Sequence, residues 1–180
     1  GVIVENVTTT AFIGKYLRDG MPLVEKCLTV DGGAVAEPKN VIAPIGTPYA
    51  DIIAACGGYK KPCKKLLMGG PMMGIVAPND SYPLLKNNNA ILALDEEQTV
   101  VPEEQACIRC GRCMHACPFH LMPRQIEKAA EAKNIAMLQK LKVMLCMECG
   151  CCSYVCPAKR NLTFTNKMAK NMVRAATAKK

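Results

Sequence analysis

One cysteine motif, present twice, constrains this chain of 180 residues more than any other feature. Both copies read C-x2-C-x2-C-x3-C-P, the first over residues 107–118 and the second over residues 146–157. The two-residue gaps allow successive side chains of a tight loop to point inward together. The proline after the last cysteine fixes φ and lacks an N–H, so the chain turns away at that point. The spacing therefore predicts two loops that each gather thiolates around a common centre.

These loops predict a pair of [4Fe–4S] clusters, because two-cluster bacterial ferredoxins hold their clusters with this spacing. In such proteins three thiolates of a motif bind one cluster, and the fourth, before the proline, binds the other cluster. The predicted ligands of the first cluster are Cys107, Cys110, Cys113 and Cys156. Those of the second cluster are Cys146, Cys149, Cys152 and Cys117.

Zinc and disulfides are the alternatives for a chain with 12 cysteines. Structural zinc also binds four thiolates, but it usually joins two C-x2-C pairs across a longer gap. A disulfide scaffold is typical of short secreted chains. Neither needs eight cysteines with both prolines, so the pattern favours iron–sulfur clusters. The other cysteines lack ligand spacing and are expected to be free thiols in a reducing, cytosolic setting: Cys27, Cys56, Cys63 and Cys151.

Hydropathy and charge restrict the setting further. Half of the residues are hydrophobic, yet no run of 18 apolar residues occurs, so no membrane span is predicted. The formal net charge is +8. Two oxidised clusters with their thiolates would contribute about −2 each and leave about +4. No acidic residue follows Glu148, whereas basic residues continue to Lys180. Such a basic end can contact an acidic partner or an anionic membrane surface, or can simply be solvated.

The part of the chain before the motifs predicts a short helix and then a small β-grasp-like module. One of the threonines at positions 8–10 would cap the helix, and Gly20 would end it. Strands are predicted at residues 26–30, 39–43 and 65–68. A tight turn at Asp31-Gly32-Gly33 would join the first two.

A second helix is predicted before the third strand. Thr47 would be its N-cap and Pro48 its first residue. Ile52, Ile53 and Cys56 would form its apolar face, and the glycines at 57 and 58 would stop it.

Residues 69–74 form a glycine-rich stretch after the third strand. Its backbone N–H groups could approach a phosphate, but it matches neither of the common phosphate-binding patterns. The stretch therefore favours a turn that passes close to another element. A loop over residues 78–89, a strand at 90–94 and an acidic stretch at 95–104 are expected to lead into the cluster domain.

The cluster domain itself is expected to be mainly helical. Residues 123–133 and 135–143 have apolar residues at helical spacing, with Asn134 as the break between them. A closing basic helix is predicted over residues 161–180. Its apolar stripe is predicted to comprise Phe164, Met168, Met172, Val173 and Ala176. The predicted fold class is thus α+β.

Charge differs between the two motifs. Arg109 and Arg112 flank the first loop, while Glu148 and Cys151 occupy the matching positions in the second. Because positive charge favours the reduced state of a cluster, the first cluster is predicted to have the higher potential. His115 and His120 lie near the first motif, but with eight thiolates neither is needed as a ligand.

Several stretches together resemble the C subunit of the Rnf ion-translocating electron-transport complexes. Residues 5–8 resemble the end of a flavoprotein domain of the complex I NADH-binding type, and residues 28–58 resemble its SLBB β-grasp domain. Residues 69–74 are similar to a further family stretch, and residues 146–157 are particularly close to the family's second motif.

The resemblance implies a domain order for the whole chain. It consists of the end of a flavoprotein domain (1–20), an SLBB-like domain (21–77), a linker with one strand (78–103), a two-cluster ferredoxin domain (104–160) and the basic helix (161–180). FMN and NADH are expected in a domain that precedes Gly1, so this chain is expected to carry electrons without a complete active site.

The resemblance also implies a setting. The protein would be a peripheral subunit at the cytoplasmic face of a bacterial membrane, with other subunits rather than nucleic acid as partners. The complex would couple ferredoxin–NAD electron transfer to the movement of Na⁺ or H⁺. Two alternatives remain: a cobalamin reductase of a bacterial microcompartment, and a partner-docking module in which clusters only stabilise the fold.

Overall fold

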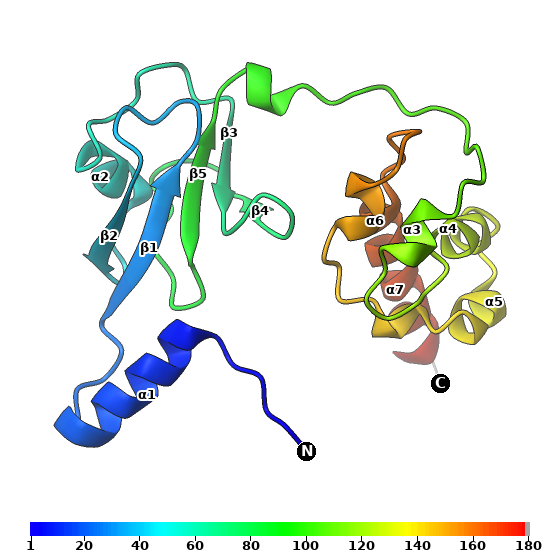
Figure 1. Ribbon diagram of the computed structural model, residues 1–180, viewed down its shortest axis with the longest axis horizontal. Coiled ribbons are helices and arrows are strands. Elements are labelled where there is room, and N and C mark those ends of the chain that lie inside the picture. The colour runs from blue at the N-terminus through cyan, green and yellow to red at the C-terminus, as the bar shows by residue number, and fades with distance from the viewer. Residues whose placement is uncertain (179–180) are drawn as a thin grey trace. The chain divides into compact units, whose positions relative to one another are not determined.

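The computed structural model describes residues 1–178 and contains two compact units, Gly1–Thr99 and Val100–Lys180. The first unit contains a sheet, and the second is built from helices (Figure 1). This confirms the predicted α+β class. Lys179 and Lys180 of the predicted basic helix lie outside the described residues. No helix within residues 1–178 is long and apolar enough to cross a membrane.

Five strands form one mixed sheet in the first unit, in the order β2-β1-β5-β3-β4. The elements of this unit are α1 (Val7–Asp19), β1 (Glu25–Asp31), β2 (Lys39–Pro44), α2 (Tyr49–Ala54), β3 (Lys65–Met68), β4 (Ile75–Val76), β5 (Ala90–Leu94) and the 3₁₀ helix η1 (Glu97–Thr99). Strand β1 pairs antiparallel with β2 and parallel with β5, and β5 pairs antiparallel with β3. The module is β-grasp-like, as predicted, but the last strand, parallel to β1, is β5 and not the predicted strand at residues 65–68.

The core of the first unit follows from the alternation of apolar residues. In β1, Leu28 and Val30 are buried and their neighbours are not, which is the two-residue period of a strand with one buried face. Ile53 of α2 joins the same hydrophobic cluster. Tyr49 is fully buried, and its hydroxyl accepts a hydrogen bond of 2.7 Å from the amide of Asn88. The one polar group of this aromatic residue is therefore satisfied.

Strand β5 lies in the middle of the sheet, between β1 and β3. This segment is predicted as a strand within a linker, outside the β-grasp-like module. In the structure, Ile91 and Ala93 are fully buried, and the first unit extends to Thr99. Because β5 is far from β1 in the sequence, local sequence patterns do not indicate its central position in the sheet.

Local details of the helix starts and of the first turn differ from the prediction. The cap of α1 is Asn6, whose side chain accepts a hydrogen bond of 2.9 Å from Thr8 N, rather than a threonine. Pro48, not Thr47, occupies the N-cap of α2, because the Thr47 hydroxyl donates to Pro44 O instead. The register pairs Val30 with Lys39, so the connection after β1 is longer than a tight turn.

The glycine-rich stretch forms the turn between β3 and β4. Gly69 has φ +104°, and Gly74 N donates to Gly70 O over 2.7 Å. A Cβ on Gly74 would lie 2.4 Å from Gly70 O, closer than any side chain permits. The turn interpretation therefore explains the glycines without a ligand.

The second unit is a small helical bundle. Its elements are α3 (Arg112–His115), α4 (Pro123–Glu131), α5 (Ile135–Lys140), the 3₁₀ helix η2 (Val143–Leu145), α6 (Cys151–Tyr154) and α7 (Leu162–Ala178). Its core contains Ile126, Leu138, Val143, Ala169 and Val173. Asn134 caps α5 by accepting a hydrogen bond from Met137 N, so the predicted break between the two helices is confirmed.

The buried face of α7 differs from the predicted apolar stripe. Phe164 and Met168 are largely exposed, at 58% and 46%. Two polar residues, Asn166 and Lys170, are buried instead, together with three apolar ones: Leu162, Ala169 and Val173. The reason is that Asn166 and Lys170 bond to the second cysteine loop.

Candidate iron–sulfur centre

The two cysteine loops have the same backbone course. Each turns through left-handed residues at three matching positions: Arg109 and Glu148, Gly111 and Gly150, and His120 and Lys159. Four of these residues are not glycine, although a positive φ is uncommon for such residues. A short helix follows the glycine in each loop, α3 in the first and α6 in the second. The two motifs, which have the same cysteine spacing, thus have the same backbone conformation.

A cavity of about 640 Å³ contains the predicted ligand set of the first cluster. Cys107, Cys110 and Cys113 reach it from the first loop, and Cys156 reaches it from the second. Cys110 is exposed, whereas Cys156 is buried. This cavity therefore has one thiol at the surface and one against the core of the unit.

A second, much smaller cavity contains the other predicted set. Cys146, Cys149 and Cys152 come from the second loop, and Cys117 comes from the first. The space left between these side chains is about 20 Å³. In both cavities, three thiols of one motif lie with the last cysteine of the other motif.

The donor set fits clusters better than a single ion. Within residues 1–178, no three Cys, His, Asp or Glu side chains converge closely enough to hold one metal ion. A tetrahedral zinc site with Zn–S bonds of about 2.3 Å would place its sulfurs about 3.8 Å apart. A cubane distributes its four thiolates over four irons, so the four thiols around the wide first cavity suit it.

The sulfurs of the second set receive several hydrogen bonds. Leu121 N donates to Cys117 Sγ over 3.4 Å, and Asn166 Nδ2 donates to Cys146 Sγ over 3.7 Å. The hydroxyl of Thr163 lies 3.6 Å from Cys152 Sγ. Burial raises the pKa of the Cys152 thiol, although the Thr163 hydroxyl opposes this shift. A cluster bound here would have to displace the proton of this thiol.

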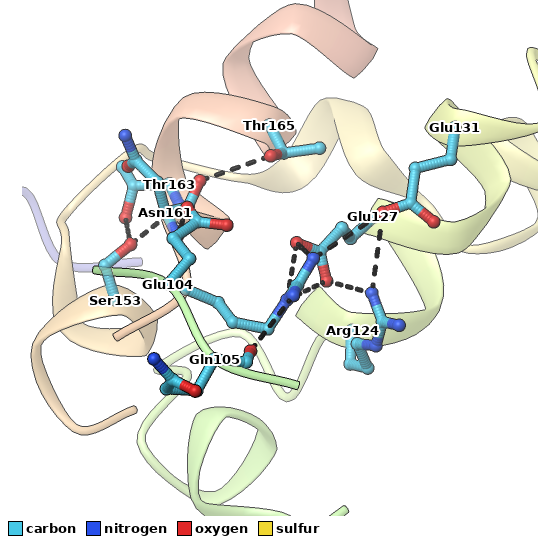
Figure 2. Close-up of polar contacts among 10 residues, drawn as sticks. Glu104, Gln105, Arg124, Glu127, Glu131, Ser153, Asn161, Thr163 and Thr165 are labelled. Atoms are coloured by element: carbon cyan, nitrogen blue, oxygen red, sulfur yellow. Dashed lines mark hydrogen bonds and ion pairs between the residues drawn. The ribbon is translucent and has the colours of Figure 1, made fainter. Parts of the chain in front are cut away.

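Basic side chains line the first cavity. They are Arg109, Arg124, Lys128 and Arg160, and no carboxylate of the described residues joins them. Glu127 is only 3% exposed and binds both Arg124 and Arg160. Figure 2 shows its contact with Arg124. The distance from Arg160 Nη2 to Glu127 Oε1 is 2.8 Å. The buried carboxylate thus fixes two guanidinium groups at the cavity.

The same network joins segments that are far apart in the sequence. Arg160 Nη1 donates to Gln105 O over 3.3 Å, and Asn161 N donates to Glu104 Oε1 over 2.8 Å (Figure 2). The stretch that enters the first loop is therefore tied to the residues that follow the second loop.

An ion pair lies beside the second cavity. Glu148 lines this cavity, and its carboxylate is 2.6 Å from Lys170 Nζ. Lys170 also donates to Cys146 O over 2.8 Å. The Lys170 side chain, 11% exposed, thus holds the second loop against α7 and compensates the charge of Glu148.

The other residues considered in the sequence differ in whether they line one of the two cavities. Arg109 lines the first cavity, but Arg112 does not. His115 and His120 are exposed and line neither cavity. Cys151 also lines neither cavity. The extra cysteines of the first unit range from exposed Cys27 to half-buried Cys63 and buried Cys56.

The sequence did not point to five residues around the cavities: Arg124, Glu127, Arg160, Thr163 and Asn166. Most lie in helices whose periodicity reveals only the apolar face. For Asn166 no local signal existed, since a polar residue in a helix predicts an exposed position.

Comparison with known proteins adds two domain families. A family described as "SLBB domain" matches residues 28–76, and one described as "4Fe-4S dicluster domain" matches residues 99–170. The first family covers strands β1 to β4, and the second covers both cysteine loops.

Curated relatives are similar to between 70% and 99% of this chain. The C subunit of a "Proton-translocating ferredoxin:NAD(+) oxidoreductase complex" of Clostridium ljungdahlii is 42% identical over 126 residues, which are 70% of this chain and 28% of the relative. The C subunit of a "Na(+)-translocating ferredoxin:NAD(+) oxidoreductase complex" of Acetobacterium woodii is 37% identical over 179 residues, which are 99% of this chain and 40% of the relative.

A third relative is the C subunit of an "Ion-translocating oxidoreductase complex" of Rhodobacter capsulatus. It is 38% identical over 144 residues, which are 80% of this chain and 28% of the relative. The chain thus spans less than half the length of each of these relatives.

Proposed function

This chain is a homologue of the C subunits of ion-translocating oxidoreductase complexes, and we propose that it is an electron relay with two [4Fe–4S] clusters in such a complex. Cys107, Cys110, Cys113 and Cys156 would hold the first cluster. Cys146, Cys149, Cys152 and Cys117 would hold the second. The clusters would supply one-electron transfer, and the protein would supply binding, placement and tuning.

One observation carries this proposal. The two cavities contain two sets of four thiols, and each set takes its fourth thiol from the other motif. Cys113 and Cys117 point to different cavities although they are four residues apart, which is about 6 Å of rise at helical pitch. Two clusters held in this way would lie close together, as a relay requires.

The chain's own residues would control access and charge. The open first cavity, with exposed Cys110, suits exchange with another redox centre. The narrow second cavity, closed by α7, suits an interior step. Neither cavity combines a nucleophile with an acid–base pair, so we assign no bond-making chemistry to this part of the protein.

The proposal also includes the cofactors, location and partners of the full-length subunit. FMN and NADH would bind in another domain of the full-length subunit. The subunit would lie peripherally at the cytoplasmic face of the membrane and bind other subunits rather than nucleic acid. In this role it would couple electron transfer between ferredoxin and NAD to the movement of Na⁺ or H⁺.

Anaerobic reconstitution of the chain tests the proposal. We expect about eight irons per chain, broad visible absorption, and electron paramagnetic resonance signals of two reduced cubanes. Replacement of Cys63 by Ser is the control and should leave the iron content unchanged. A preparation that binds one or two zinc ions and no iron–sulfur cluster would refute the relay.

A further inference from the structure

One face of α7 contacts the second cysteine loop through polar side chains. Thr163, Asn166 and Lys170 are spaced by three, four and seven residues, so they lie on one side of the helix. Thr163 reaches Cys152 Sγ, Asn166 reaches Cys146 Sγ, and Lys170 reaches Cys146 O. The helix thus touches two of the four sulfurs around this cavity.

Asn166 is the least expected of these residues. It is 1% exposed and lines the second cavity. Its Nδ2 donates to Cys146 Sγ over 3.7 Å, whereas its Oδ1 is buried without a hydrogen-bond partner among the described residues. A buried acceptor without a partner destabilises a fold, so packing alone does not account for an amide at this position.

Binding of iron would determine which end of the Asn166 amide faces the Cys146 sulfur. A metal-bound Cys146 is a thiolate, and a thiolate only accepts hydrogen bonds. The amide must then present its NH₂ group, and not its oxygen, to the sulfur. Lys170, on the same face of α7, also holds this loop through Cys146 O and Glu148.

We propose that Asn166 is a positioning residue that raises the reduction potential of the second cluster through its hydrogen bond to Cys146 Sγ. The inference rests on the proposed relay function and specifies its second site. Reduction adds negative charge to a cluster and its sulfurs, so an N–H donor stabilises the reduced form more than the oxidised form. In the described residues, side-chain donors to cysteine sulfur occur only around the second cavity.

The test is a redox titration monitored by electron paramagnetic resonance, with the wild-type chain and Asn166→Leu compared. Leucine has the same branched shape as asparagine and lacks the donor. We expect the equilibrium constant for reduction of one cluster to fall about threefold to tenfold, where tenfold is about 59 mV for a one-electron couple. The midpoint of the other cluster should not move. Asn166→Gln, which keeps an amide donor, should recover part of the shift.

Asn171→Leu is the matched control, because Asn171 is an exposed amide on the same helix. It should leave both midpoints unchanged. If Asn166→Leu does not assemble its second cluster, Asn166→Ala, which requires no added volume, replaces it in the titration. Two assembled clusters with both midpoints unchanged would overturn the role of Asn166. A wild-type chain without clusters would instead refute the relay itself.

Discussion

The first cysteine loop, residues 107–118, and the second, residues 146–157, turn through left-handed residues at matching positions but face different surroundings. Around the first lie four basic side chains, and the cavity is wide. Around the second, the cavity is narrow, α7 supplies hydrogen bonds to sulfur, and Glu148 is compensated by Lys170. The comparison teaches that the spacing of cysteines determines the loop, whereas neighbouring helices determine its electrostatics.

These surroundings imply two ways to stabilise an added electron. At the proposed first site the stabilisation would come from charge in a partly solvated region. At the proposed second site it would come from short-range donors in a buried region. Mutations can therefore affect one site and leave the other unchanged, and the predictions below follow in order of decreasing effect.

Removal of the cysteine before the proline should have the largest effect, and it should act on the cavity of the other motif. Cys156→Ala should lose the first cluster and retain the second, because its thiol lies with the first set. Cys117→Ala should do the reverse. Each variant should retain about four of about eight irons.

The measurement is iron analysis with redox titration, in which each variant is compared with Cys110→Ala and Cys149→Ala. Cys156→Ala should retain the same midpoint as Cys110→Ala. Agreement with Cys149→Ala instead would show that the ligands do not cross between the motifs.

Replacement of Glu127 by Gln should destabilise the second unit. The carboxylate is buried and compensates Arg124 and Arg160, whose side chains are 28% and 18% exposed. Loss of one partner of a buried ion pair costs about 3–5 kcal/mol, and partial exposure of the arginines reduces this to about 2–3 kcal/mol.

Denaturant unfolding of the loaded protein, followed by the loss of visible absorption, measures this effect. Glu131→Gln is the control, since Glu131 contacts the same arginines but is 56% exposed. We expect less than about 1 kcal/mol for it. Equal effects of the two variants would mean that the buried position of Glu127 is irrelevant.

Much of this architecture could be predicted from the sequence, for identifiable physical reasons. The cysteine spacing determined which thiols share a cavity, because short loops leave few ways to bring them together. The strand at Lys65–Met68 and the helix that starts at Pro123 were predicted from local apolar periodicity and turn residues. In each case the signal lies within about ten residues.

The errors arose where partners are distant in sequence. Strand β5 pairs with β1 across about 60 residues, so nothing local reveals its central place. Asn166 and Lys170 are buried because they bond to Cys146, about 20 residues away. A prediction from periodicity treats polar residues as exposed. It therefore placed the buried face of α7 on the wrong side of the helix. The network around Glu127 was missed for the same reason.

Charge removal at the first loop should have a smaller effect than either of these changes. Arg109→Gln and Arg112→Gln together should lower the midpoint of the first cluster, because positive charge favours its reduced form. For exposed charges about 8 Å away, roughly 0.5–1 kcal/mol is expected, which is a few tens of millivolts. Arg109 should account for most of it, since it lines the cavity and Arg112 does not.

Site-resolved potentiometry measures this shift. Glu148→Gln is the matched variant at the equivalent position of the second loop, and it should raise the second midpoint. Lys170 already compensates Glu148, so this rise should be the smaller of the two shifts. If the first midpoint is unchanged in the double arginine variant, the charges of Arg109 and Arg112 do not cause the difference in midpoint between the two clusters.

The smallest effect should be the change of these midpoint shifts with salt concentration. This change distinguishes stabilisation by long-range charge from stabilisation by short-range hydrogen bonds. Arg109 and Arg112 are exposed, so the shift caused by their removal should shrink severalfold between 0.1 M and 1 M salt, as the screening length falls from about 10 Å to about 3 Å. The shift caused by Asn166→Leu should not change, because that donor is buried at 3.7 Å from sulfur. Redox titrations at both salt concentrations measure the two differences. If both shrink alike, the second site is also stabilised by long-range charge, and the contrast between a charged open loop and a hydrogen-bonded closed loop fails.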